Sequence, residues 1–150
     1  EDNLKKVVDR YPNVSVVDAG DVFAQEMDIY APCALGATIN DESISRMKCR
    51  IIAGAANNQL ANEEKHGQLL LEKGIVYAPD FLINAGGLIN CYSELEGYNR
   101  ERAMDQAEHI YDTTMTVLSK SEDEGKPMYQ IANQMAEERI NKIAQIHRSL

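Results

Sequence analysis

Four short apolar runs mark the first half of the chain, and polar or helix-forming stretches separate them. Runs this short, with several β-branched residues, are typical of buried strands. Where such strands alternate with helices, they usually pair in parallel within βαβ units. The pattern therefore predicts an α/β fold with a largely parallel sheet, whose strands lie at 14–17, 27–31, 50–54 and 74–78.

Apolar residues at helical spacing open the chain and dominate its last third. The clearest connecting helix, over 62–73, has acidic residues in its first turn, a lysine in its last and Gly74 behind it, as the helix dipole and the C-terminal turn prefer. Asn99 suits the N-cap of a later helix, and 120–127 forms a charged break. Helices are predicted over 4–10, 62–73, 84–95, 99–119 and 128–147.

Composition narrows the class of protein. The 150 residues suffice for one domain with a sizeable core, and 24 acidic against 15 basic residues give a net charge of −9. That charge, without any block of Lys or Arg, argues against nucleic acid as a partner. The apolar runs are far shorter than the roughly 20 residues of a membrane span. Three widely spaced cysteines without a Cys-x-x-Cys predict no metal site, but reduced, mostly buried thiols in a cytoplasmic protein.

Three clusters of small and polar residues, at 31–36, 54–59 and 77–87, each follow or end a predicted strand. The carboxyl ends of parallel strands are where such sheets bind ligands. Small residues let the backbone approach a ligand closely, and Asn amides offer both donors and acceptors. Any one cluster alone is best explained as a turn. Three at equivalent positions favour a site for a polar, planar ligand.

Catalytic groups are scarce. His66 lies within a predicted helix, which favours a packed or capping side chain over a general base. Asp80 follows Pro79, as expected for a turn or a cap. No cation lies near Cys33 in the sequence to activate its thiol. The sequence therefore predicts no catalytic residue, and it contains no Gly-x-Gly-x-x-Gly for a dinucleotide.

Three stretches follow one another along the chain: 28–36, 52–60 and 77–87, with His66-Gly67 between the last two. Together they resemble the amino-acid dehydrogenase family, which includes glutamate, leucine, phenylalanine and valine dehydrogenases. The stretches 94–104 and 135–140 most resemble its leucine-acting branch. That resemblance implies reversible oxidative deamination of an L-amino acid to a 2-oxo acid and ammonia, with hydride passing to NAD. It implies that 1–98 form the latter part of a Rossmann-like NAD domain, and that helices in 99–150 pack back toward a substrate domain.

The resemblance also implies roles for eight residues. Three would line the path from the adenosine to the nicotinamide, and an Asn pair would lie beside the nicotinamide ribose and the substrate carboxylate. A further Asn would face the nicotinamide carboxamide, and two residues one helical turn apart would line the side-chain pocket. Since a thiol is a poor partner for a carboxylate, that pocket favours an apolar substrate. The residues are Cys33, Ala34 and Leu35, then Asn57 and Asn58, then Asn84, and finally Leu88 and Cys91.

The family's catalytic lysine and Asp general acid/base belong to its first domain, and none of the eight lysines here has the Gly-rich setting of that motif. The resemblance thus implies a portion of a longer, homo-oligomeric enzyme that is inactive alone. Its leucine-acting branch favours NAD over NADP and a branched-chain substrate, with phenylalanine or valine as alternatives. A non-catalytic nucleotide-binding module and an oligomerisation module are the alternatives from other functional classes.

Overall fold

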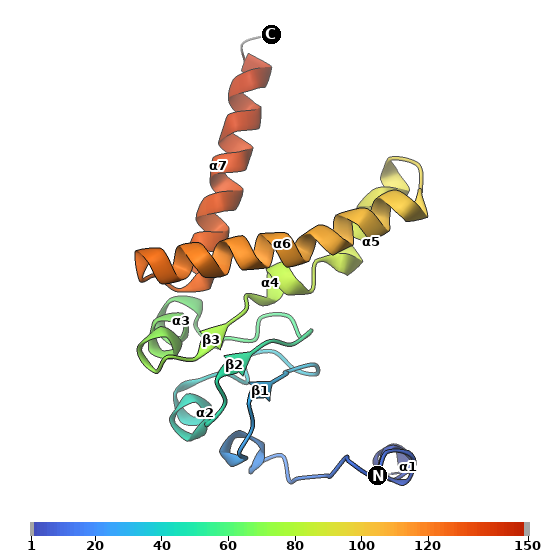
Figure 1. Cartoon of the computed structure of the whole chain (residues 1–150), viewed down its shortest axis with the longest axis vertical. Helices are drawn as coiled ribbons and strands as arrows, with labels where there is room; N and C mark the ends of the chain where they lie inside the picture. The colour runs from blue at the N-terminus through green and yellow to red at the C-terminus, as the bar shows by residue number, and fades with distance from the viewer. Residues whose placement is uncertain (1, 149–150) are drawn as a thin grey trace.

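The computed structural model describes residues 2–148, with side chains up to 146, and separates a small sheet from a helical part (Figure 1). The sheet half contains, in chain order, α1 (Asp2–Arg10), η1 (Val22–Ala24), β1 (Ile29–Tyr30), α2 (Asp41–Arg46), β2 (Ile51–Ile52), α3 (Glu63–Glu72) and β3 (Val76–Tyr77). The helical part contains α4 (Asp80–Ile83), α5 (Gly86–Leu95), α6 (Arg100–Glu124) and α7 (Met128–Arg148).

The sheet has the order β1-β2-β3, and both strand pairs are parallel. Ile51 of β2 lies between Ile29 and Val76 of the outer strands. The predicted α/β fold with a parallel sheet is therefore confirmed. The strand predicted at 14–17 is wrong: its residues pair with no strand in the described chain, and Val16 is 55% exposed, so β-branched side chains alone did not make a strand.

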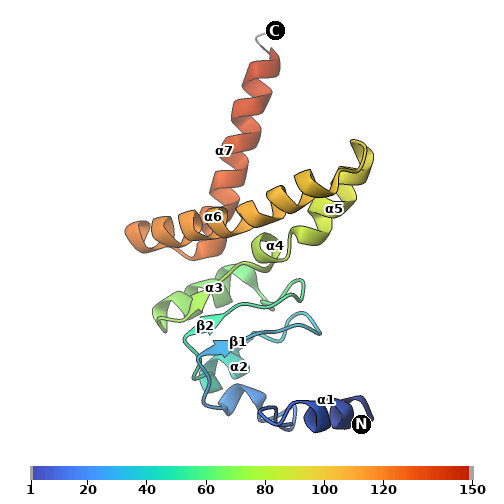
Figure 2. The same cartoon turned by 45° about the vertical axis from the view of Figure 1, so that its right-hand side comes forward.

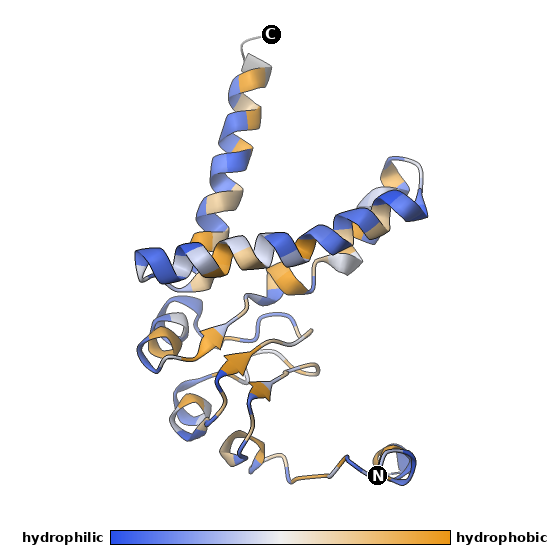
Figure 3. Cartoon of the chain, viewed as in Figure 1, coloured by the Kyte–Doolittle hydropathy of each residue, from blue (hydrophilic) through white to orange (hydrophobic). Residues whose placement is uncertain are grey.

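Apolar side chains from the strands and from α2 and α3 form the principal core. Ile52 of the central strand and Ile39 of the preceding loop are both fully buried. Figure 3 shows the strands as the apolar centre of this half, with polar segments around them. The α2 helix, which the sequence analysis did not predict, begins with a capping box in which the Asn40 and Ser43 side chains each accept the other residue's backbone N–H.

A second, smaller core lies between α6 and α7. It consists of Val117, Met128, Ile131 and Ala132. Figure 2 shows α6 crossing above the sheet half while α7 projects away from it. Asn99 caps α6 as predicted, because its side chain accepts the Arg102 N–H at 3.0 Å. The predicted break at 120–127 is wrong in extent: α6 continues to Glu124 and ends at Gly125, whose φ of +63° suits glycine.

The three cysteines are free, but two of them are exposed. Cys49 is buried, whereas Cys33 and Cys91 face solvent. The prediction of mostly buried thiols is therefore wrong, because Cys33 lies in a loop at the sheet edge and Cys91 on the outer side of α5. No helix among the described residues combines the length and apolar character that a membrane crossing requires.

Candidate functional site

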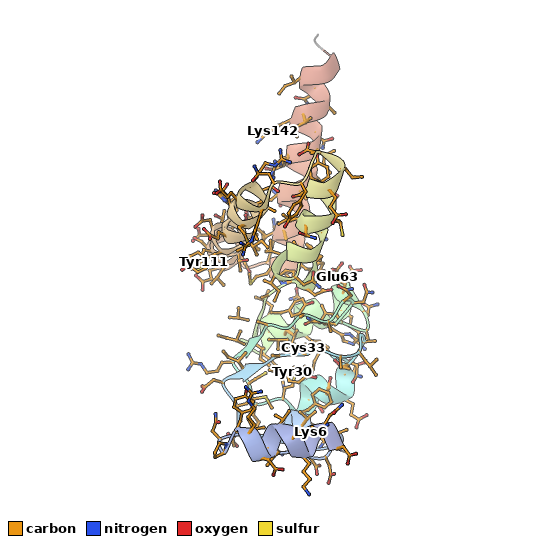
Figure 4. All side chains as sticks on the ribbon, turned by 90° about the vertical axis from the view of Figure 1, so that its right-hand side faces the viewer. Lys6, Tyr30, Cys33, Glu63, Tyr111 and Lys142 are labelled. Carbon is orange, nitrogen blue, oxygen red and sulfur yellow. The ribbon has the colours of Figure 1, made fainter. Side chains whose placement is uncertain are left out.

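The loops that follow the three strands meet at one edge of the sheet, because parallel strands all end there. The first two loops are joined directly. Ala56 N–H donates to the Pro32 carbonyl at 2.9 Å, and Ala55 N–H donates to Cys33 Sγ at 3.5 Å. Figure 4 shows Cys33 at the level of the sheet, beside Tyr30 of β1. Two of the predicted clusters thus form one surface.

The same two loops meet again a few residues further on. Ala37 N–H donates to the Asn58 carbonyl at 2.7 Å. Among the described residues, Ala37 (φ +57°) and Asn58 (φ +52°) are the non-glycine residues with a positive φ. Such backbone costs free energy and persists only where its surroundings fix it. A Cβ on Gly36 would lie 2.7 Å from the Asn57 carbonyl oxygen, so this close approach requires glycine.

The third loop is joined to the second by side chains. Asn84 Nδ2 donates to Asn57 Oδ1 at 2.7 Å and lies 3.3 Å from the Ala55 carbonyl oxygen. Asp80 Oδ2 accepts the Asn58 backbone N–H at 2.7 Å. The side-chain hydrogen bonds of these two residues use Asn84 Nδ2 and Asn57 Oδ1, and among the described residues Asn84 Oδ1 and Asn57 Nδ2 have no partner. The amide pair therefore keeps one acceptor and one donor for a ligand.

A cavity of about 230 Å³, with two acidic residues in its lining, lies between the second loop, α3 and the start of α4. Burial, and next the hydrogen bond to the Asp80 carboxylate, raise the pKa of the Tyr77 hydroxyl, which donates to Asp80 Oδ1 at 2.8 Å. Burial, and next the charge of Asp80, raise the pKa of Glu63. Gln59 is fully buried and donates to the Gly54 and Ala56 carbonyls. The cavity is lined by Asn58, Gln59, Leu60, Glu63, Tyr77, Asp80 and Phe81.

The structure brings together four of the eight predicted residues through direct contacts or contacts to adjacent backbone: Cys33, Asn57, Asn58 and Asn84. Ala34 and Leu35 lie in the same first loop and are exposed. Leu88 and Cys91 lie outside this network, exposed and one turn apart on α5. The edge therefore presents amides, a thiol and apolar side chains.

His66 and Asp80 were both predicted as structural. His66 is buried and its Nδ1 accepts the Asn62 N–H at 2.9 Å, so the predicted capping role is confirmed. Asp80 does begin α4, but it also binds a loop 22 residues earlier in the chain, which the sequence analysis missed because no local pattern encodes that partner. Across the described residues, no three His, Cys, Asp or Glu side chains are placed to hold a metal.

The sequence and the fold both match known amino-acid dehydrogenases. The chain is 53% identical over 140 residues to leucine dehydrogenase from Thermoactinomyces intermedius, covering 93% of this chain and 38% of that protein. It is 46% identical over 134 residues to L-tryptophan dehydrogenase from Nostoc punctiforme, covering 89% of this chain and 38% of that one.

A crystal structure of L-tryptophan dehydrogenase from Nostoc punctiforme superposes with a TM-score of 0.87 at 44% identity, over 93% of this chain and 43% of that one. The chain thus spans about two fifths of the length of these relatives. A family model described as glutamate/leucine/phenylalanine/valine dehydrogenase matches residues 1–148. With the parallel sheet, the three joined loops and this match over nearly its full length, the chain belongs to the glutamate/leucine/phenylalanine/valine dehydrogenase family.

Proposed function

We propose that this chain is the cofactor-binding part of an NAD-dependent dehydrogenase that deaminates a branched-chain L-amino acid of the leucine kind. The observation that carries the proposal is the Asn57–Asn84 amide pair at the carboxyl edge of the sheet. Its free acceptor and free donor complement a carboxamide, which has one donor group and one acceptor. The nicotinamide ring of NAD carries such a carboxamide.

The residues of this edge suit a dinucleotide. Bound NAD supplies the hydride acceptor. Asn84 Oδ1 and Asn57 Nδ2 would hold the carboxamide, and Cys33, Ala34 and Leu35 would line the path toward the adenosine. Gly36 lets the first two loops lie against each other, and the exposed small side chains of Ala34 and Ala37 beside it leave room for a flat ligand to approach the backbone. In this proposal, these residues bind the cofactor and orient its nicotinamide ring.

The proposed substrate class rests on α5. Asn58 would bind the substrate carboxylate, while Leu88 and Cys91 would contact the substrate side chain. Neither of these two side chains offers the charged donor that a second carboxylate needs, so an apolar amino acid is favoured. The leucine and tryptophan dehydrogenases to which the chain is similar are both named for amino acids with apolar side chains. Leucine is proposed over phenylalanine because the chain is 53% identical to that leucine dehydrogenase and 44% identical to the phenylalanine dehydrogenase from Bacillus thermotolerans.

The lysine and Asp that move protons in this family have no counterpart in the motifs found here. We therefore propose that they come from outside these 150 residues, in a cytoplasmic homo-oligomer, and that this chain alone binds NAD without turnover. Leucine-dependent NADH formation by the purified chain would contradict this part of the proposal.

Calorimetric titration of NAD into the purified chain tests the binding function, and calorimetry suits a chain without tryptophan. We expect saturable binding that Asn84→Ala weakens about tenfold, the effect of losing a hydrogen bond to the ligand. Asn133→Ala, at an exposed position on α7, is the matched control and should bind like the wild type. Equal affinities of the wild type and Asn84→Ala would contradict the proposed site, and a parallel titration with NADP measures the cofactor preference.

A further inference from the structure

Asp80 uses both oxygens of its carboxylate to connect two elements. Oδ1 accepts the Tyr77 hydroxyl at 2.8 Å, and Oδ2 accepts the Asn58 backbone N–H at 2.7 Å. We propose that Asp80 is a positioning residue for the Asn57–Asn84 amide pair and that α4 holds the loop after β2 at two points. This inference rests on the proposed function, because the amide pair matters only where it binds the nicotinamide ring.

Tyr77 fixes the direction of the Asp80 carboxylate. Its ring is 6% exposed at the end of β3, so the hydroxyl has a defined place. Burial and the nearby carboxylate raise the pKa of this hydroxyl, which therefore remains protonated and continues to donate at neutral pH. A carboxylate that accepts from one fixed donor presents its second oxygen in a fixed direction, toward Asn58.

Asn58 needs this support because its backbone is left-handed, with φ +52°. Its carbonyl accepts the Ala37 N–H on one side, and its own N–H donates to Asp80 on the other. A non-glycine residue keeps a left-handed backbone conformation where several neighbouring groups hold it in place. Without Asp80, the peptide between Asn57 and Asn58 loses its bond on the N–H side, so we expect the Asn57 side chain to leave its defined position.

The second point of contact is Asn84, which follows α4 directly. Asn84 N–H donates to the Asp80 carbonyl at 2.9 Å, so one turn of helix sets the separation of the two residues. Asp80 binds the backbone of Asn58, while Asn84 binds the side chain of the adjacent Asn57. Both contacts fall on consecutive residues of one loop. The position of the amide pair therefore depends on the hydrogen bond by which Asp80 holds α4 against this loop.

Two substitutions at Asp80 test this role in the full 150-residue chain. Asp80→Ala removes both hydrogen bonds, and we expect the Kd for NAD to rise about tenfold. Asp80→Asn keeps an oxygen for the Asn58 N–H, so its Kd should stay within about threefold of the wild type. Amide NMR gives a second readout without ligand: in Asp80→Ala, the Asn58 backbone N–H and the Asn57 side-chain NH₂ signals should move, and in Asp80→Asn they should remain near their wild-type positions.

Glu63→Gln is the matched control. The Glu63 carboxylate is close enough to Asp80 for the charge of Asp80 to raise its pKa, but it forms no hydrogen bond to this loop in the described structure. Removing its charge should leave the Kd within about twofold. If Asp80→Ala does not fold, Tyr77→Phe replaces it, since this variant keeps the Asp80 carboxylate and removes the hydroxyl that directs it, which also accepts the Asp80 N–H at 3.4 Å. Its Kd should rise about threefold.

The positioning role is overturned if Asp80→Ala, or Tyr77→Phe in its place, binds NAD like the wild type and leaves the Asn57 signals unmoved. Asn84→Ala separates this failure from that of the proposed function. If Asn84→Ala weakens binding and Asp80→Ala does not, only the positioning role is wrong. If the wild type binds no NAD, the proposed function fails, and the Asn57 and Asn58 signals still decide whether Asp80 orders the amides.

Discussion

Around the sheet, eight buried apolar side chains form one cluster among the described residues, whereas the cluster between α6 and α7 contains four. Beyond Met135, every described side chain of α7 is exposed. The carboxyl edge differs from both regions, because hydrogen bonds between loops, rather than apolar burial, hold its amides together. Substitutions in the three regions should therefore affect different measured quantities.

The largest loss of stability is expected from Ile52→Ala. Ile52 is fully buried in the central strand, and shortening such a side chain costs about 2–5 kcal/mol of unfolding free energy. Ile143→Ala is the matched change on α7, where the side chain is 47% exposed, and should change stability by less than about 0.5 kcal/mol. Urea denaturation followed by circular dichroism measures both, and equal losses would remove the distinction between the two regions.

Gly54→Ala should destabilise the junction between sheet and site. A Cβ at this position would overlap the Pro32 carbonyl oxygen and lie 2.5 Å from the Pro32 ring nitrogen, and backbone atoms can move little to relieve such a clash. We expect a loss of about 1–3 kcal/mol in chemical denaturation, together with weaker NAD binding, because the ends of β1 and β2 must separate. Gly20→Ala adds a methyl group where nothing lies within 4 Å. A Gly54→Ala variant as stable as Gly20→Ala would show that this junction is loose.

Asn99→Ala should weaken the helical part by about 1 kcal/mol, since the Asn99 side chain accepts the Arg102 N–H at the start of α6. Thermal unfolding followed at 222 nm measures the loss. Asn133→Ala, within α7, changes the same residue type where no cap exists and should have little effect. No difference between the two variants would mean that packing alone sets the start of α6.

The smallest effect is expected from the ion pair between Asp41 and Lys65, whose Nζ lies 2.7 Å from Asp41 Oδ2. The hydrogen bond from Lys65 lowers the pKa of the Asp41 carboxyl below its ordinary 3.8. A lowered pKa in the folded state stabilises the protein above that ordinary value, and this contribution is lost as pH falls through the folded pKa. The small Tm advantage of the wild type over Asp41→Asn should therefore be present at neutral pH and vanish in strong acid.

Sodium chloride at about 1 M should also reduce this Tm advantage, because exposed charges are screened. Lys65→Met removes the other partner and should reproduce the pH dependence of Asp41→Asn. A Tm difference that stays constant down to strong acid would show that the pair contributes nothing by its charge.

The local pattern of apolar and charged residues predicted several helices and strands. Apolar runs predicted the three paired strands, and the charges and Gly74 around 62–73 predicted α3, which spans Glu63–Glu72. The 14–17 run failed because a strand needs a partner, and its residues pair with none in the described chain. The charged break failed because exposed acidic residues continue a helix readily until Gly125 ends it.

At the site, residue types predicted which loops converge but not how they are joined. Small residues and Asn after three strands were a sufficient signal for the shared edge, since topology alone brings those ends together. The bond between Asp80 and Asn58 joins residues 22 positions apart through the backbone of one of them. Such a contact follows no spacing rule in the sequence, so it is visible only in the folded structure.

The joined loops bear on how such a protein can be re-engineered. Each of the three loops supplies a partner to another, through Cys33 with Ala55, Ala37 with Asn58, and Asn57 with Asn84. A chimera that exchanges one loop with a homologue would break contacts whose other half stays behind, so all three should be transplanted as a single cassette. Leu88 and Cys91, which we propose to contact the substrate side chain, lie outside this network on α5. If that proposal holds, they are the positions to randomise first in a library built to change substrate choice while keeping the cofactor.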